Sequence, residues 1–384
     1  MKKVLFSFFL ISGIAAHSQV ELGANRMESY LPKIKNKRVA LAINQTSVLG
    51  NKQLLLDTLL KLNIDVKKIF SPEHGFRGDI PDGALIGNSV DEKTGLPVIS
   101  LYGKQRKPSA SDLEDVDAVI FDIQDVGVRF YTYISTMHVL MEACAEFHKK
   151  MIVLDRPNPI AHIIDGPILK EDCKSFVGMH PIPIAYGLTI GELAMMINGE
   201  NWLGDKEKKL KCDLEVIALK NYSHHTPYHL PVKPSPNLPN DHAVALYPSI
   251  CLFEGTALSL GRGTTFPFEC IGHPSLKLEF EFTPKSIPDM SKNPPLLGEL
   301  CRGEDLRNVI PKNEVDLSYI IRFYKLFPEK NKFFNSARFK KLAGTDALQK
   351  QIESGLSEKQ IKATWKQGLD KFKVTRKKYL LYND

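Results

Sequence analysis

The sequence predicts an α/β fold built on a mostly parallel β-sheet that helices cover on both faces. From residue 37 onward, short apolar runs alternate with helical stretches, and the runs are apolar at nearly every position. Continuous apolar strands separated by helices are typical of parallel sheets buried on both faces. The expected strands are 38–44, 66–70, 97–102, 118–122, 151–155 and 214–219, with helices around 53–62, 132–149 and 191–202.

The pattern changes after about Pro274, which predicts a second, smaller α+β domain. Residues 276–282 alternate between apolar and polar, as a half-exposed strand does, and residues 350–371 look like one amphipathic helix. We therefore expect residues 19–273 to form the main domain and residues 274–384 to close one side of a cleft.

Residues 1–18 have the features of a secretory signal peptide. Lys2 and Lys3 precede the apolar run Val4–Ala16, and Ala16 and Ser18 supply small residues for cleavage. The apolar run is too short for a good membrane span. We therefore expect an exported protein, periplasmic or secreted, with no membrane insertion after the signal peptide is removed.

Composition and motifs argue against several partners and cofactors. The formal charge of +7 falls to +5 without Lys2 and Lys3, which is too mild to indicate a nucleic-acid partner. Six scattered cysteines without a Cys-x-x-Cys pair indicate no structural zinc. No Gly-x-Gly-x-x-Gly follows the first strand, and no Gly-x-Ser-x-Gly is present. We expect no cofactor and no metal; the oligomeric state and any disulfide pairing stay open.

Polar residues follow the ends of the predicted parallel strands. Ligands bind beyond the carboxyl ends of the strands in open α/β sheets, so these residues would share one rim. Turn chemistry accounts for the Asn, Asp and Pro residues but poorly for Glu73, Gln124 and Arg129. The rim residues include Asn44 after the first strand, Glu73 and His74 after the second, Gln124 and Asp125 after the fourth, and Arg156 and Asn158 after the fifth.

Several long motifs together resemble the exo-β-N-acetylmuramidase family, formerly a family of unknown function. They are Ser71-Pro-Glu-His-Gly-Phe-Arg-Gly78, Phe121-Asp-Ile-Gln-Asp-Val-Gly-Val-Arg-Phe-Tyr-Thr-Tyr133, Asp155-Arg-Pro-Asn-Pro159, Phe253-Glu-Gly-Thr-Ala-Leu-Ser-Leu-Gly-Arg-Gly-Thr264 and Pro267-Phe-Glu269. The resemblance runs from about residue 25 to the C-terminus. It implies a Rossmann-like catalytic domain, a smaller C-terminal domain, and an active site in the cleft between them.

The resemblance also implies a reaction. This is hydrolysis of the β-1,4 bond that holds a non-reducing terminal N-acetylmuramic acid in peptidoglycan fragments. Glycoside hydrolysis usually needs a protonated carboxylic acid and a second group at the anomeric carbon. Glu73 matches the family glutamate and is the expected general acid. Asp125 is the leading second carboxylate, ahead of Asp122 and Glu269, and the substrate's own 2-acetamido group is an alternative.

Muramic acid carries a lactyl carboxylate, which an arginine can bind with its planar fork. Arg129 and Arg262 are the preferred contacts, while Arg77 and Arg156 are further candidates and Arg156 is the one most expected to pair with Asp155. Tyr131 and Tyr133 could stack on a sugar or simply pack. The remaining expected substrate contacts are Asn44, His74, Gln124, Asn158 and Glu269. The Pro-rich segment 227–239 should form a rigid wall of the cleft.

Two other functions use the same features. A non-catalytic periplasmic sugar-binding module would need the cleft but not Glu73. A metal-dependent amidase or phosphatase would need ligands that the loop histidines offer only weakly, because His224, His225, His229 and His242 lack helical pairing beside an acid.

Overall fold

The computed structural model describes residues 19–78, 87–103, 105–205 and 207–384. The predicted signal peptide, residues 1–18, lies outside the described residues. None of the helices in the described part of the chain is long and apolar enough to cross a membrane.

Within the described residues, seven strands form the large sheet in the order β3-β4-β2-β1-β5-β6-β9. All neighbours pair in parallel except β3, which is an antiparallel edge strand. Without β3, the order is that of a Rossmann fold, in which strand order reverses beside the first strand. The strands are β1 (Arg38–Ile43), β2 (Asp65–Ser71), β3 (Ser89–Val90), β4 (Pro97–Ser100), β5 (Ala118–Asp122), β6 (Lys150–Leu154) and β9 (Asp213–Ile217).

Both faces of this sheet are buried, which confirms the expected doubly covered sheet. Along β1, Val39, Leu41 and Ile43 face one apolar cluster, while Ala40 and Ala42 face the other. The first cluster includes side chains of α1 (Met27–Ile34) and α2 (Leu55–Lys61). The second includes side chains of α3 (Ala110–Leu113), α4 (Tyr133–Glu146) and α5 (Ile190–Gly199). Because each strand is covered on both sides, apolar residues occupy consecutive positions rather than alternate ones.

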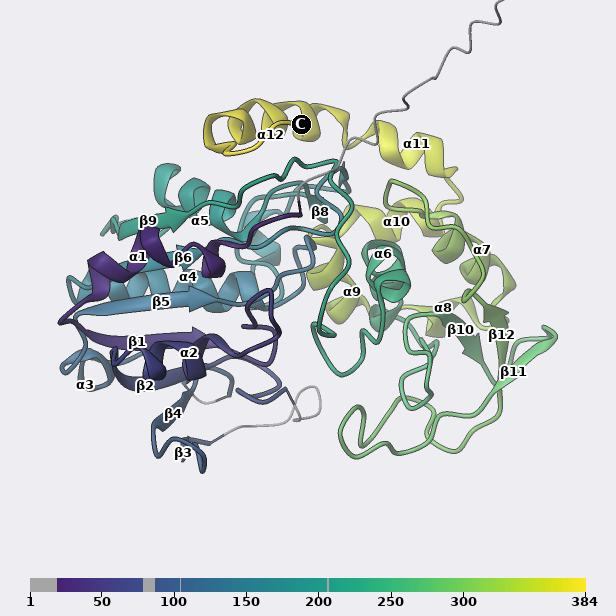
Figure 1. Cartoon of the computed structure of the whole chain (residues 1–384). Coiled ribbons are helices and arrows are strands. Elements are labelled where there is room, and N and C mark those ends of the chain that lie inside the picture. The colour runs from purple at the N-terminus through teal and green to yellow at the C-terminus, as the bar shows by residue number, and fades with distance from the viewer. Residues whose placement is uncertain (1–18, 79–86, 104, 206) are drawn as a thin grey trace, which may run out of the picture.

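A smaller antiparallel sheet and most of the remaining helices lie at the carboxyl end of the large sheet's strands (Figure 1). The small sheet has the order β10-β12-β11, with β10 (Cys270–His273), β11 (Phe280–Phe282) and β12 (Cys301–Asp305). The helices that follow the large sheet in the chain are α6 (Asp241–Ile250), α7 (Ser318–Leu326), α8 (Lys330–Phe333), α9 (Ser336–Ala343), α10 (Ala347–Glu353), α11 (Glu358–Ala363) and α12 (Lys366–Arg376).

The expected single helix over residues 350–371 is wrong, because the segment is divided among α10, α11 and α12. Gly355 follows α10 with φ +78°, a left-handed conformation that glycine adopts without strain. Ser357 then caps α11 through a capping box with Gln360. The apolar residues Ile361 and Trp365 still face the core, so the pattern of burial was predicted although the helix boundaries were not.

The C-terminal segment returns to the large sheet. Helix α12 lies along the side of the molecule formed by α5 and β9 (Figure 1). Arg376 at its end donates to the carbonyl of Gly187 at 2.6 Å. The hydroxyl of Tyr382 then donates to the buried carboxylate of Asp155, which follows β6, at 2.6 Å. The last residues of the chain therefore fasten the small domain to the rim of the large sheet.

Candidate active site

The ends of β1 and β5, where strand order reverses, are tied to each other by buried polar groups. Asn44 accepts hydrogen bonds from the backbone N–H of Thr46 at 2.9 Å and from its hydroxyl at 2.5 Å. The same hydroxyl oxygen accepts from the backbone N–H of Gln124 at 3.0 Å. Gln124 in turn donates to the carbonyls of Asp125 and Pro157. These hydrogen bonds hold the loops after β1, β5 and β6 together.

A cavity of about 200 Å³ lies above this rim, between the large sheet and the C-terminal part of the chain. The strand-end loops and the Pro-rich wall contribute Glu73, His74, Tyr102, Phe130, Tyr131, Thr132, Tyr133, Val177, Ser235, Asn237 and Leu238. The later part of the chain contributes Tyr247, Cys251, Glu254, Arg262, Phe268, Arg338 and Leu342. Ligand pockets usually measure about 300–1,000 Å³, so this cavity suits a small group such as a single sugar.

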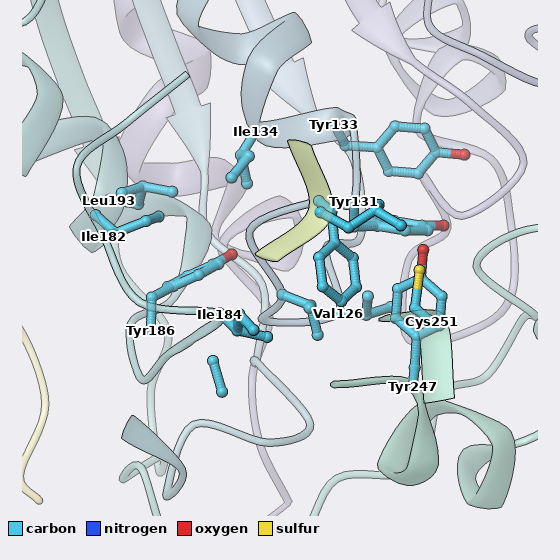
Figure 2. Packing of buried hydrophobic residues seen from close by; sticks show 14 of the residues in the cluster. Val126, Tyr131, Tyr133, Ile134, Ile182, Ile184, Tyr186, Leu193, Tyr247 and Cys251 are labelled. Carbon is cyan, nitrogen blue, oxygen red and sulfur yellow. The ribbon is translucent and has the colours of Figure 1, made fainter. Parts of the chain in front are cut away.

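Aromatic rings form much of the cavity wall. Tyr131 packs edge-on against Tyr133, with ring centroids 4.7 Å apart, and against Tyr247 at 6.1 Å. Figure 2 shows Tyr131 and Tyr133 extending the same way from the start of α4, near Tyr247 and Cys251. Aromatic faces and edges of this kind suit the apolar faces of a sugar ring.

Glu73 lies in the loop that follows β2 and is half-buried at the cavity wall. The hydroxyl of Thr132 donates to its Oε2 at 2.8 Å. The neighbouring residue His74 is buried and has φ +70°, which is an uncommon conformation for a residue other than glycine. Backbone strain of this kind is concentrated at functional sites.

The other expected carboxylates are held away from the cavity. Asp122 is completely buried and forms a two-point ion pair with Arg156, at 2.5 and 2.9 Å. Asp125 accepts from Tyr186 and from the N–H of Gly127, and burial raises its pKa to about 6. Figure 2 shows Tyr186 grouped with Ile182, Ile184 and Leu193, apart from the cavity tyrosines.

Glu269 is likewise hydrogen-bonded to neighbouring side chains. Its carboxylate accepts from Nδ1 of His242 at 2.8 Å and from Asn240 at 3.1 Å. It therefore fixes the start of α6 rather than lining the cavity. Asn158 has a similar local role, because its side chain donates to Leu188 and accepts from the N–H of Ile160.

Among the four expected arginines, only Arg262 lines the cavity. Arg129 is completely buried and donates to four backbone carbonyls, those of Pro167, Ile182, Leu342 and Ala343. Burial lowers the pKa of Arg129 to about 9. The expectation that Arg129 contacts substrate does not fit this placement, because its guanidinium joins the loop carbonyls of Pro167 and Ile182 to the last turn of α9.

The two remaining arginines are also in ion pairs. Arg77 pairs with Asp91 at 2.6 Å beside a different hollow, and Arg156 pairs with Asp122 rather than with the expected Asp155. The sequence placed them in recognisable motifs but did not identify these partners.

Glu254 and Arg338 are cavity residues that the sequence did not single out. Glu254 accepts from Arg262 at 2.5 Å and from Arg338 on α9 at 2.7 Å. Burial raises the pKa of Glu254, but the two arginine charges outweigh burial and the pKa is lowered overall. Glu254 stands next to Phe253 in a recognisable motif, whereas Arg338 occurs in an ordinary polar helix, so only Glu254 had a signal in the sequence.

Three of the four loop histidines, His224, His229 and His242, pair with carboxylates, whereas the ring of His225 lies 6.5 Å from that of His162. Nε2 of His224 lies 2.8 Å from Glu192, and Nδ1 of His229 lies 2.8 Å from Asp241. Within the described residues, no group of three or more His, Cys, Asp or Glu side chains is arranged to hold a metal ion.

Comparison with known proteins gives the family. A model described as the N-terminal region of the exo-β-N-acetylmuramidase NamZ matches residues 39–242, and the corresponding C-terminal model matches residues 245–382. The chain belongs to the exo-β-N-acetylmuramidase NamZ family. The resemblance seen in the motifs is therefore confirmed.

Relatives of this family match nearly the whole chain. The peptidoglycan β-N-acetylmuramidase NamZ of Bacillus subtilis strain 168 is 41% identical over 394 aligned residues, covering 96% of this chain and 92% of that protein. Crystal structures of two DUF1343 family proteins from Bacteroides fragilis also match. One has a TM-score of 0.88 at 50% identity and covers 96% of this chain and 100% of its own. The other has a TM-score of 0.82 at 30% identity and covers 95% of this chain and 99% of its own.

The cavity lies between the two regions matched by the NamZ models. Its lining residues up to Leu238 fall in the N-terminal match, and those from Tyr247 onward fall in the C-terminal match. The models meet between residues 242 and 245; the expected domain boundary at residues 273 and 274 stays a prediction.

Proposed function

We propose that this NamZ-family protein is an exo-acting β-N-acetylmuramidase in which Glu73 is the general acid. It would hydrolyse the β-1,4 bond of a non-reducing terminal N-acetylmuramic acid in peptidoglycan fragments. The observation that carries the role of Glu73 is its position on the wall of a sugar-sized cavity between the two NamZ regions. The substrate follows from the family and from the peptidoglycan β-N-acetylmuramidase that is 41% identical.

The surroundings of the two lining carboxylates support the choice of Glu73. Glu254 is fixed between two arginines that hold it ionised, so it is poorly suited to donate a proton. Glu73 instead accepts from the neutral hydroxyl of Thr132. A carboxyl group positioned by a neutral hydroxyl at a cavity wall can donate a proton to a leaving oxygen.

The second catalytic group is the 2-acetamido group of the substrate in this proposal. Asp125, the expected protein carboxylate, is buried outside the cavity lining beneath Tyr186 and Gly127. The acetamido oxygen would form a bond to the anomeric carbon as the glycosidic bond breaks and Glu73 protonates the leaving oxygen. Water would then attack that carbon, Glu73 would take its proton, and the acetamido bond would break. Two displacements at one carbon retain the anomeric configuration.

Arg262 is the proposed contact for the lactyl carboxylate. It lines the cavity, its guanidinium lies 5.0 Å from the ring of Phe268, and Glu254 holds its orientation. An arginine fixed in this way has little conformational entropy to lose when it binds a carboxylate.

Export is part of the proposal, because it would bring the enzyme to its substrate. Its support is the basic and apolar pattern of residues 1–18. Secretion of a reporter fused to these residues, with loss of secretion when Lys2 and Lys3 become Glu, would test it.

The proposed function is tested by incubating the purified protein with a synthetic muramyl β-glycoside and with the equivalent N-acetylglucosaminyl β-glycoside. We expect release of N-acetylmuramic acid from the first and little turnover of the second. Cleavage of neither compound, or of the second alone, would overturn the substrate assignment. Tight binding without cleavage would favour a sugar-binding module instead.

A further inference from the structure

Two hollows continue outward from the active-site cavity. The first, of about 300 Å³, shares Val177, Glu254, Arg338 and Leu342 with the cavity. The second, of about 410 Å³, shares Arg106, Ser175 and Phe176 with the first. The wall residues that they share place the three spaces next to one another. We call the outer two hollows the basic groove; Arg106, Lys174, Phe176, Trp202, Arg338 and Lys341 line it.

The basic groove carries an excess of positive charge. Four cations and two carboxylates, Glu142 and Glu254, line it. Arg338 pairs with Glu254 at 2.7 Å and Lys174 pairs with Glu171 at 2.9 Å, so Arg106 and Lys341 supply the excess charge. Glu254 holds two arginines, while Glu142 accepts from the N–H of Gly204 at 2.9 Å and lies 3.4 Å from His138. A groove of this kind attracts an anionic ligand.

Aromatic side chains in fixed positions line the same groove. The guanidinium of Arg106 lies 4.5 Å from the ring centroid of Phe176, and Tyr102 from the main cavity packs against that ring at 6.4 Å. The backbone there is anchored, because Ser135 donates to the carbonyl of Phe176 at 2.7 Å and Ser175 pairs with Gly178. Further along, the half-buried ring of Trp202 packs on the buried His180 at 5.7 Å. Fixed rings beside charged groups suit a saccharide that bears carboxylates.

We propose that the basic groove binds the sugars that follow the terminal disaccharide, which are the anionic remainder of a longer peptidoglycan fragment. This inference rests on the proposed function. A single terminal sugar fills the inner cavity beside Glu73, the second sugar lies at the edge of this cavity, and the later sugars lie in the adjoining groove. The carboxylate of the next muramic acid along the chain meets the cations of the groove. The enzyme is therefore selective for longer fragments although it releases one sugar at a time.

The test compares initial rates of terminal muramic acid release from a muramyl-glucosaminyl disaccharide and from the tetrasaccharide with two such units. The wild-type protein should have a higher kcat/KM for the tetrasaccharide. Arg106→Ala and Trp202→Leu should lower the tetrasaccharide value about tenfold, which corresponds to about 1.4 kcal/mol, and change the disaccharide value less than about twofold. Lys340→Ala is the matched control, because Lys340 precedes Lys341 on α9 but pairs with Asp172 outside the groove.

A neutralised substrate tests whether the groove recognises the carboxylate of the inner muramic acid. A tetrasaccharide whose inner muramic acid is a methyl ester should lose the wild-type advantage, and Arg106→Ala should then have no further effect. Equal losses on disaccharide and tetrasaccharide would overturn the proposal, because the groove would then bind the terminal disaccharide and not the sugars that follow it. Absence of a chain-length preference in the wild type would overturn it too. Failure of the wild type to cleave even the disaccharide would instead defeat the proposed function. If Trp202→Leu lowers the unfolding midpoint of the protein, Trp202→Phe takes its place. Arg106 is exposed, so we expect Arg106→Ala to leave the fold intact.

Discussion

The hydroxyl of Thr132 donates a 2.8 Å hydrogen bond to Oε2 of Glu73. Thr132 is the N-cap of α4, a position where threonine usually accepts a hydrogen bond from the helix backbone. Its side chain makes no such capping bond here. The hydroxyl therefore fixes the carboxyl group on the loop after β2, and the start of α4 positions the proposed general acid.

Thr132→Val should lower kcat about tenfold with little change in KM, because the carboxyl group loses its fixed orientation without losing a substrate contact. Thr132→Ser keeps the hydroxyl and should remain within about threefold of the wild type. Steady-state kinetics on a muramyl β-glycoside would measure both. Equal activity of the valine and serine variants would show that this hydrogen bond does not position Glu73.

Arg262→Ala should raise KM for a muramyl substrate by about tenfold or more, because a carboxylate loses a charge-assisted partner. The same variant should have little effect on a substrate whose lactyl group is a methyl ester. Arg77→Ala is the matched control, since Arg77 pairs with Asp91 outside the cavity. If both substrates lose affinity equally, Arg262 supports the cavity wall through Glu254 and does not read the carboxylate.

Arg129→Leu should lower the free energy of unfolding by about 3–5 kcal/mol, because several buried carbonyls would lose their charged donor. The carbonyls belong to both domains, at Ile182 and Ala343 among others. Urea unfolding at constant pH measures the change, and the molecules that remain folded should keep the wild-type KM. A large rise in KM with unchanged stability would instead indicate that Arg129 contacts the substrate.

Asp155 should make the stability depend on pH in an unusual direction. Burial, with a contribution from the charge of Glu192, raises its pKa to about 7, although Tyr382 and Thr189 donate to it and oppose this shift. Between about pH 4 and pH 7 the folded state therefore holds a proton that the unfolded state has lost. The stabilising contribution of the protonated group is complete below about pH 4 and declines as the pH rises toward 7.

Asp155→Asn removes this titration and keeps an acceptor for the backbone N–H of Gly191. The variant should therefore gain stability relative to the wild type as the pH rises through this window, by at most about 1.4 kcal/mol per pH unit. Paired urea titrations at pH 4.5, 6 and 7.5 would measure the difference. A difference that stays constant with pH would mean that Asp155 is already ionised in the folded protein.

The sequence predicted the large sheet well because each strand is covered on both faces. Burial on both sides leaves continuous apolar runs such as 118–122. Because the strands are parallel, the residues that follow these runs all lie at the same edge of the sheet. This is why the sequence predicts that Glu73 and His74 lie at one rim with Gln124, whereas Tyr131 and Tyr133 were found through their motif. Arg262 was found through its motif and not through any periodicity.

The partners of each charged group could not be predicted, because they come from segments far apart in the chain. Asp125 and Glu73 both follow a strand, yet of these two only Glu73 lines the cavity. The carboxylate of Asp125 instead accepts a hydrogen bond from Tyr186 of β8 (Ala185–Tyr186). Arg338 lies 84 residues after Glu254, the carboxylate that it pairs with, and no local sequence pattern marks it. The division of residues 350–371 into several helices depended on turn residues that the apolar pattern does not reveal.

The role of Glu73 is tested most directly by the dependence of Glu73→Gln on the leaving group. With a muramyl-glucosaminyl disaccharide, whose leaving oxygen needs a proton, kcat should fall by about a thousandfold or more while binding of the disaccharide is retained. With a dinitrophenyl β-muramide, whose leaving group departs without a proton, bond cleavage in a single turnover should fall by less than about tenfold. Equal losses on both substrates, or undiminished cleavage of the disaccharide, would contradict the assignment of Glu73 as the general acid.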